Sequence, residues 1–370
     1  MKKLSILIPL LMEVFAVSRA FPAQPSGMVV GWGNINFGEY GMVSGFQSNG
    51  VVAISNHIIT NAVAISAGGL FSLAVLENDD VVGWGFGQPN NLPLRKGMGR
   101  NGPFILGTNG PVIFNGLPVT GVTKVAAGHS HGLALLKDGN VLTWGGTPDV
   151  KGNIGAEVLA PKGLRNIKAI AAGDYRSLTL TDEGIVQVWG RGNPAPEGLT
   201  NVIAISAGVG GAGREDAALK RDGTVVTWNV RGIPGQQARQ PEGMSNIVAV
   251  TAGGAHILAL QDNGTVWGWG FNPHGEATGE PTSEENQDAA GIVRIDGKIL
   301  DKVSAVAAGV GCSLALRKDG TLLFWGADPY NRIKPPPNLN GVVAIALSES
   351  RGLAITTNKF LAKQRDVYER

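Results

Sequence analysis

One unit recurs along the chain, and it constrains the fold more than any other feature. Each copy has a β-rich run ending in Ala-Gly, a few variable residues, a run like Leu-Ala-Leu, a turn like Asp-Gly, and a strand ending in Trp-Gly. The copies span Val63–Gly85, Val122–Gly145, Ile167–Gly190, Val202–Asn229, Ile247–Gly270 and Val303–Gly326. Five copies place the Trp 17 residues after the Ala, as in Ala67 and Trp84, whereas the fourth places Trp228 21 residues after Ala207. The fourth copy therefore carries four extra residues, which lie within Val209–Asp216.

Two half units complete the repeat at the ends of the chain. Val29–Gly33 is a Trp-Gly strand with no first half before it, and Val342–Thr357 is a first half with no Trp-Gly strand after it. Matching half units are what a closed ring needs, because the first strand completes the last sheet and removes an exposed edge. We therefore predict an all-β fold, a seven-bladed β-propeller whose ring is closed when the Trp32 strand joins the C-terminal half unit.

The composition agrees with many short strands and tight corners. The chain has 55 glycines in 370 residues, roughly twice the average share. Turns such as Asp138-Gly139 are hairpin signals in which both central residues are expected to take positive φ. We expect the repeated Trp to fill the space between blades, and the Ala-Gly pair to lie where strands crowd toward the axis. The connection 191–201 has 11 residues, too few for two strands and their turns, so the blade of the third repeat is predicted to be reduced at its outer edge.

The N-terminus has the features of a signal peptide. Lys2 and Lys3 precede an apolar run, and small residues stand at Ser18 and Ala20, which is typical of an export signal and its cleavage site. We predict a signal peptide over 1–20, one propeller over 21–358 and a charged, frayed tail over 359–370. The predicted location is outside the cytoplasm, secreted or periplasmic.

Charge and cysteine content exclude several classes of partner and site. Residues 1–20 hold three basic residues and one acidic residue, and 28 of each sign remain after them. A neutral chain has no general attraction for nucleic acid or for anionic membranes. Apart from the N-terminus, no run approaches the length of a membrane-spanning helix. Cys312 is the single cysteine, so there is no disulfide within the chain. A monomer is expected.

The stretch Val125–Gly145, Val-Ala-Ala-Gly-His-Ser-His-Gly-Leu-Ala-Leu-Leu-Lys-Asp-Gly-Asn-Val-Leu-Thr-Trp-Gly, resembles the regulator-of-chromosome-condensation repeat. The resemblance extends from about Val29 to Thr357. The short linkers and the unpaired closing half are more similar to exported bacterial members, such as the propeller-type β-lactamase inhibitor proteins, than to the nuclear exchange factors. The resemblance implies a seven-bladed propeller that binds another molecule.

The resemblance also implies a His at one position after Ala-Gly, where it ties one strand to the next through hydrogen bonds. Here that position holds Phe71, His131, Arg176, His256, Cys312 and, in the last half unit, Arg351. A metal site built from His129, His131 and His256 is the alternative, but no carboxylate recurs at a fixed spacing from them. Cys312 has no fixed-spacing His or Asn partner, so it is predicted to be structural rather than a nucleophile. No metal or cofactor is expected.

The variable residues after Ala-Gly are the candidates for partner binding, as the resemblance to the inhibitor proteins implies. The extra segment of the fourth repeat is either a flexible excursion or a loop that reaches a partner through its polar end. The predicted partner-binding residues are Phe71, His129, Tyr175, Arg176, Arg214, Glu215, Asp216 and Arg351. Only two of them are aromatic, which argues against tight β-lactamase inhibition, because interface hot spots favour Trp, Tyr and Arg.

Three hypotheses about function remain. The first is an exported, non-catalytic propeller that binds a protein or glycan through one face of the ring. The second is a lyase or hydrolase with its site at the central channel, although the metalloprotease motif H-E-x-x-H is absent from the sequence. The third is an exchange factor for a small GTPase, which rests on fold analogy and is opposed by the signal peptide and the neutral charge.

Overall fold

The computed structural model describes most of the repeat region. It covers residues 26–33, 49–54, 57–85, 91–92, 110–114, 117–145, 159–210, 215–229, 240–283, 287–328, 333–349 and 351–358. The predicted signal peptide, the predicted tail and Arg214 lie outside these ranges. Strands are the regular structure throughout the described residues, and none of those residues forms a helix that could cross a membrane.

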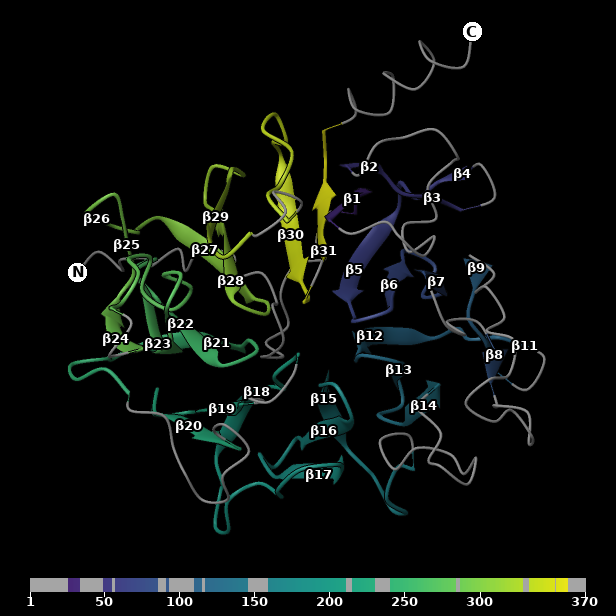
Figure 1. The fold of residues 1–370 in the computed structure, drawn as a ribbon. Coiled ribbons are helices and arrows are strands. Elements are labelled where there is room, and N and C mark those ends of the chain that lie inside the picture. The colour runs from purple at the N-terminus through teal and green to yellow at the C-terminus, as the bar shows by residue number, and fades with distance from the viewer. Residues whose placement is uncertain are drawn as a thin grey trace, which may run out of the picture.

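Seven antiparallel sheets follow one another around a ring, as Figure 1 shows. We number these blades from the sheet of the first complete repeat. Blade 1 is β5 (Ala62–Ala67), β6 (Phe71–Leu76), β7 (Val81–Gly85) and β9 (Gly110–Pro111). Blade 2 is β12 (Val122–Ala127), β13 (His131–Leu136) and β14 (Val141–Gly145). Blade 3 is β15 (Ile167–Ala172), β16 (Arg176–Thr181) and β17 (Val186–Gly190).

The remaining four blades repeat this order from the ring axis outward. Blade 4 is β18 (Val202–Ser206), β19 (Asp216–Lys220) and β20 (Val225–Trp228). Blade 5 is β21 (Ile247–Ala252), β22 (His256–Gln261), β23 (Val266–Phe271) and β24 (Asp288–Ile292). Blade 6 is β27 (Val303–Ala308), β28 (Cys312–Arg317) and β29 (Leu322–Gly326). Blade 7 is β30 (Val342–Leu347), β31 (Arg351–Thr356), β1 (Met28–Gly33) and β2 (Asn49–Val51). The predicted all-β propeller is confirmed.

Blade 7 combines the two ends of the repeat region. β1 pairs antiparallel with β31 along its whole length, from Met28 opposite Thr356 to Gly33 opposite Arg351. β30 and β31 in turn contact β5 of blade 1. The strand that carries Trp32 thus lies in the sheet of the C-terminal half unit.

Three connections carry a short hairpin that attaches to the outer side of a blade. These hairpins are β3 (Ala53–Ile54) with β4 (His57–Ile58), β10 (Ile113–Phe114) with β11 (Leu117–Pro118), and β25 (Arg294–Ile295) with β26 (Lys298–Ile299). β10 also pairs in parallel with β8 (Asn91–Leu92). The attachment is the same each time, because a valine three residues before the repeated Trp accepts a backbone N–H from the residue that leads into the hairpin. Val29, Val81 and Val266 accept from Val52, Val112 and Val293 at 2.9, 2.9 and 2.8 Å.

The repeated Trp residues fill the seams between blades, as predicted. Each of the seven is at most 8% exposed and belongs to a separate apolar cluster formed with the preceding blade. Nearer the axis, the glycine of Ala-Gly lies against the next blade. A Cβ on Gly128 would come within 2.4 Å of the carbonyl oxygen of Gly173. The repeat therefore needs a small residue where neighbouring inner strands converge.

The Asp-Gly turns differ from the prediction. Gly139 has a φ of 80° and its N–H bonds to the carbonyl of Leu136, while Asp138 keeps a negative φ. The turn is thus a type I turn followed by a left-handed glycine, in which one residue rather than two needs positive φ. The Asp138 carboxylate instead accepts the N–H of Asn140 at 3.0 Å.

Candidate functional site

The position after Ala-Gly that holds His131 and His256 points into the neighbouring blade. His131 Nε2 lies 3.0 Å from Ser177 Oγ, and His256 Nε2 lies 2.8 Å from Ser313 Oγ. Both imidazoles are nearly or fully buried, and burial lowers the pKa of His131 to about 3 and that of His256 to about 4. The prediction that these residues tie adjacent strands is confirmed, and the ties join one blade to the next.

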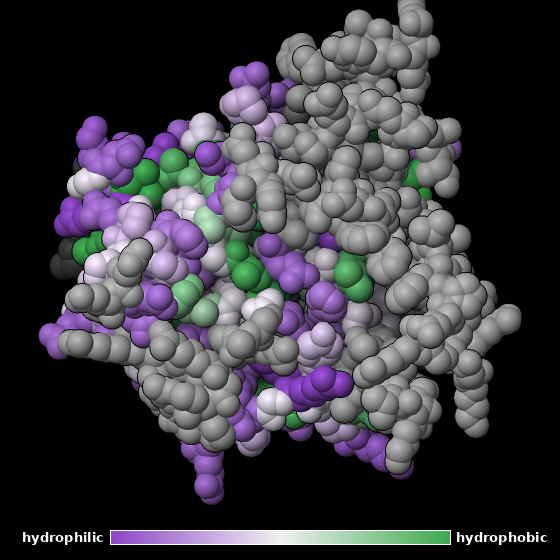
Figure 2. Space-filling view, in the orientation of Figure 1, coloured by the Kyte–Doolittle hydropathy of each residue, from purple (hydrophilic) through white to green (hydrophobic). Residues whose placement is uncertain are grey.

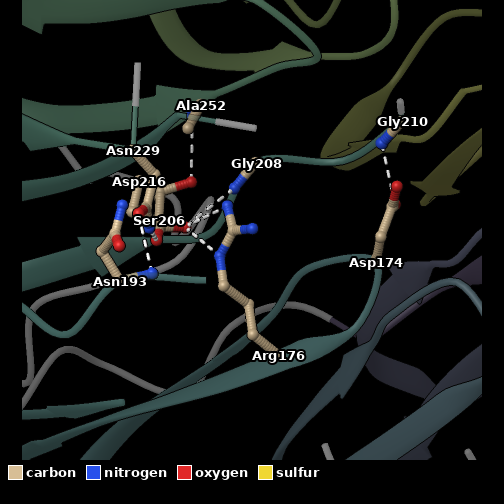
Figure 3. Close-up of polar contacts among 9 residues, drawn as sticks. All are labelled: Asp174, Arg176, Asn193, Ser206, Gly208, Gly210, Asp216, Asn229 and Ala252. Atoms are coloured by element: carbon tan, nitrogen blue, oxygen red, sulfur yellow. Dashed lines mark hydrogen bonds and ion pairs between the residues drawn. The ribbon is translucent and has the colours of Figure 1, made fainter. Parts of the chain in front are cut away.

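Blade 3 makes the same connection with different chemistry (Figure 3). Arg176 occupies the His position, and its Nη2 and Nε lie 2.7 and 2.8 Å from Asp216 Oδ1 in blade 4. Asp216 stands 12 residues before Trp228, as Ser177 stands 12 before Trp189, so it occupies the Ser position. Its second oxygen accepts Asn229 Nδ2 at 2.7 Å. We call these cross-blade pairs latches.

Five of the predicted partner-binding residues are buried. Phe71, Arg176, Glu215, Asp216 and Arg351 are 3, 1, 2, 0 and 0% exposed. The expectation that they contact a partner is therefore wrong for this structure, since a side chain without accessible surface cannot touch a docked molecule. Their positions follow from the repeat, because all five occupy the His or Ser position, where the side chain is enclosed between two blades. Arg351, for example, donates from Nη2 to the carbonyl of Gly69 in blade 1 at 2.7 Å.

The extra residues of the fourth repeat are thereby limited to 209–214. Glu215 and Asp216 belong to the repeat itself and are not part of a protruding loop. The first residues of the insertion turn inward across the ring. Gly210 donates its N–H to Asp174 Oδ1 of blade 3 at 2.7 Å (Figure 3), and a Cβ on Gly210 would come within 1.9 Å of Val310 Cγ2 of blade 6.

His129 and Tyr175 remain on the surface, on the side of the ring where the loops after Ala-Gly lie. We call this side the loop face. His129 Nδ1 is 3.2 Å from Glu349 Oε1, and their side chains are 28% and 30% exposed. The pair passes over Gly69, where a Cβ would lie 2.4 Å from His129 Nδ1 and 2.9 Å from Glu349 Oε1. Blades 7, 1 and 2 are thus joined at one point.

The two side chains of this pair shift each other's protonation. The hydrogen bond to Glu349 raises the pKa of His129, and burial opposes it. The same bond lowers the pKa of Glu349. The interaction therefore favours the charged form of both groups near neutral pH.

Tyr175 connects His129 to a cation that the sequence analysis missed. The ring centroids of His129 and Tyr175 are 6.0 Å apart with an interplanar angle of 43°, and Arg191 Cζ lies 4.9 Å from the Tyr175 centroid. Arg191 follows Trp189-Gly190, and its N–H donates to the carbonyl of Tyr175 at 2.7 Å. The sequence could have predicted that Arg191 lies beside Tyr175. The strand that ends in Trp-Gly runs antiparallel to the strand that begins after the Ala-Gly loop, so the residue after Trp-Gly lies next to that loop. We call His129, Tyr175, Arg191 and Glu349 the loop-face cluster.

The chemistry of these residues favours recognition over catalysis. The two Ser–His pairs have the atoms of a nucleophile and a base, but both lie enclosed between blades with no surface for a substrate. Cys312 is fully buried, and burial raises the pKa of its thiol to about 12, which keeps it protonated. In the described ranges, no group of three or more His, Cys, Asp or Glu side chains is arranged to hold a metal ion. The described surface in Figure 2 mixes hydrophilic and hydrophobic residues.

Comparison with known proteins gives the same repeat and the same fold. The regulator of chromosome condensation (RCC1) repeat matches residues 122–147 and 247–276. The structure is similar to Prp20p from Saccharomyces cerevisiae, studied for its binding to Gsp1p and histones, at 18% identity and a TM-score of 0.63, with 96% of each chain covered. Yeast RCC1 (Prp20) bound to Kap60 matches at 18% identity and a TM-score of 0.63, covering 100% of this chain and 98% of that one. Human WBSCR16 matches at 17% identity and a TM-score of 0.60, covering 89% of this chain and 99% of that one.

Proposed function

Because this chain is a propeller built from repeats of the RCC1 type, we propose that it is an exported, non-catalytic recognition protein whose loop face binds a protein partner. The observation that carries the proposal is that the residues after Ala-Gly divide into a buried set and an accessible set. The latch residues are buried and join blade 2 to blade 3, blade 3 to blade 4 and blade 5 to blade 6. In contrast, His129, Tyr175, Arg191 and Glu349 stay accessible beside one another. Buried residues set the shape, and the accessible ones are free to differ from blade to blade.

The loop-face cluster has the character of a protein-binding hot spot. Tyr and Arg are enriched at such sites, and a ring held between two neighbours loses little conformational entropy on binding. Arg191 is exposed and keeps its N–H donors available while its face covers Tyr175. Glu349 supplies a carboxylate from the other side of His129. A partner that offers a carboxylate to Arg191 and a donor to Glu349 would match this arrangement.

The similar proteins support the proposal of protein binding, and they also suggest the main alternative function. Prp20p is described by its binding to Gsp1p and histones, so RCC1-type propellers can present protein-binding surfaces. Exchange activity on a small GTPase is therefore the second candidate. A glycan ligand is the third, because the predicted export signal places the chain where glycans are common.

The test is binding of the full chain to the secreted and envelope proteins of its source organism. Tyr175→Ala and His129→Ala should weaken capture of the same partner at least tenfold. Asp222→Ala is the matched control, because Asp222 is exposed on a hairpin turn between the second and third strands of blade 4. A partner that binds both alanine variants as well as the parent would refute the loop face as the binding site. Accelerated nucleotide release from a small GTPase, or retention on a glycan array, would replace the proposal by one of its competitors.

A further inference from the structure

Blade 3 ends in β17, and no further strand pairs with its outer edge in the described part of the chain. The connection that follows β17 is described in full over 191–201 and contains no strand, which confirms the predicted reduction. It packs instead over the seam with blade 4, through Ala195 and Leu199. Blades 1, 5 and 7 have an additional strand at this place, namely β9, β24 and β2.

The equivalent residues of other blades show which backbone groups of β17 face outward. Val29, Val81 and Val266, three residues before the Trp, bind a hairpin through their carbonyl groups. In blade 4 the carbonyl of Val225 accepts Gln240 Nε2 at 2.7 Å. Val186 holds this position in blade 3, and among the described residues no donor reaches its carbonyl from outside the blade. Because outward groups alternate along a strand, Val188 and Gly190 also face outward.

In the part of the chain that the structure describes, the β17 edge lacks the usual protection against strand pairing. Its five residues, Val186–Gly190, include no proline, no lysine and no other charge. Ile185, just before the strand, is 50% exposed. Protected edges carry charges, proline, bulges or a covering segment, so this one is open to an added strand.

Opposite charges stand at the two ends of the edge. Glu183 and Arg191 are both exposed, and each is four residues from Gln187. When two copies of an edge pair antiparallel about a two-fold axis at Gln187, each Glu183 falls opposite the Arg191 of the other copy. The same register sets Val186 opposite Val188 of the other copy, so the outward N–H and C=O groups of these two residues can bond to each other across the interface. The neighbouring register, centred on Val188, would place Arg191 opposite Ile185 and would form neither ion pair between the two copies.

We propose that β17 pairs antiparallel with β17 of a second copy of this chain, with Gln187 at the two-fold axis and Glu183–Arg191 ion pairs at both ends. The interface is isologous, so one surface supplies both halves. Its small size makes the dimer weak and dependent on concentration. The pairing uses blade 3 alone, but Arg191 also belongs to the loop-face cluster, so a variant that leaves Arg191 unchanged is needed to separate dimer formation from partner binding. It replaces the monomer expected from the sequence.

The experiment is sedimentation equilibrium of the full chain from low micromolar to several hundred micromolar, in low salt. The parent should show a reversible monomer–dimer equilibrium. Glu183→Arg and Arg191→Glu each place like charges opposite each other at both ends, which should raise the dissociation constant by about fivefold or more. The double variant exchanges the two charges and should restore the parent value to within about twofold. This reciprocal restoration is specific to a second copy, because an unrelated partner strand would not exchange its charges.

Val188→Pro tests the backbone pairing separately. Proline removes an outward N–H that the blade does not use. Val188 also packs against the cluster around Trp228, so Val188→Ala is the matched control for the lost packing. The two variants should melt at similar temperatures, and only Val188→Pro should lose the dimer. If Val188→Pro unfolds the chain, the charge reversals decide alone. A parent that stays monomeric throughout the range overturns the proposal. So does a dimer that is indifferent to both reversals, or one that the double variant fails to restore.

Discussion

The guanidinium of Arg176 and the carboxylate of Asp216 form a buried ion pair that joins blade 3 to blade 4, with Nη2 2.7 Å from Oδ1. The equivalent positions of the seams between blades 2 and 3 and between blades 5 and 6 hold a His and a Ser. The two positions therefore change together, from a neutral hydrogen bond to an ion pair. Asn229 and the N–H of Gly208 complete the set of donors around Asp216.

Removing one partner of the Arg176–Asp216 latch should lower the free energy of unfolding strongly, whereas replacing both partners by His and Ser should not. Arg176→Ala leaves a buried carboxylate without its cation, which should lower the free energy of unfolding by about 3–5 kcal/mol. The double variant Arg176→His/Asp216→Ser installs the latch of the other seams and should recover most of that loss. Urea denaturation provides the measurement.

The exposed pair Lys220–Asp222 is the control for that comparison. Asp222→Ala should cost less than about 1 kcal/mol, as exposed ion pairs do. If Arg176→Ala costs no more than Asp222→Ala, the latch does not hold the seam together.

The buried histidines should make the protein less stable in acid. The pKa of His131 is lowered to about 3 and that of His256 to about 4 from an ordinary value of 6.5. As the pH falls below 6.5, the unfolded chain binds protons that the folded chain does not accept, so the free energy of unfolding decreases. His131→Gln and His256→Gln retain a hydrogen-bonding group without titrating, and together they should flatten the profile between about pH 6.5 and pH 4. An unchanged slope in the double variant would contradict this assignment.

Glu276 should destabilise the fold at neutral pH. It is 1% exposed, one of its oxygens accepts the N–H of His274 at 2.9 Å, and the other has no hydrogen bond in the described part of the chain. Burial raises the pKa of Glu276 above its ordinary 4.5. The stability that the protonated form provides is thus present below pH 4.5 and lost as the pH rises through the folded-state value. Glu276→Gln should stabilise the protein at pH 7 by about 1–2 kcal/mol and remove this dependence; a destabilised variant would show that the carboxylate has a partner.

The ion pair on the loop face can be followed directly by NMR titration. Glu349 raises the pKa of His129, so Glu349→Gln should bring the His129 titration down toward 6.5. The contribution of the pair to stability is present between pH 4.5 and pH 6.5, and it is lost as the pH rises through the folded-state pKa of His129 or falls through that of Glu349. Glu77→Gln, which changes a carboxylate in blade 1 outside this pair, should leave the His129 titration where it is. An identical midpoint in the parent and Glu349→Gln would show that the two side chains do not interact in solution.

The repeat made the ring predictable, whereas the site could be predicted only in part. The 17-residue spacing placed five strand triplets and their Trp residues correctly, because each seam needs the same large side chain at the same height. The short connection 191–201 was likewise enough to predict the open edge of blade 3. The 17-residue spacing does not hold in blade 4, because the insertion lies before the second strand of that blade. Counting 12 residues back from Trp228 instead gives Asp216, the residue that pairs with Arg176.

The ion pair between His129 and Glu349 illustrates the part that sequence patterns do not carry. It depends on which loops meet across blades 7, 1 and 2, and this is a property of the closed ring. The burial of Arg351 was equally hard to foresee, because an arginine in a variable loop is usually solvated, and this one is enclosed by its latch position.

The central claim, that the loop face binds a protein partner, is tested most directly by a photo-crosslinking residue placed at Tyr175 and, as control, at Asp222. We predict that the Tyr175 position forms a crosslink to one partner protein in the native compartment, that the Asp222 position does not, and that Arg191→Ala abolishes the crosslink. Crosslinking to the same partner from Asp222 but not from Tyr175 would contradict the account.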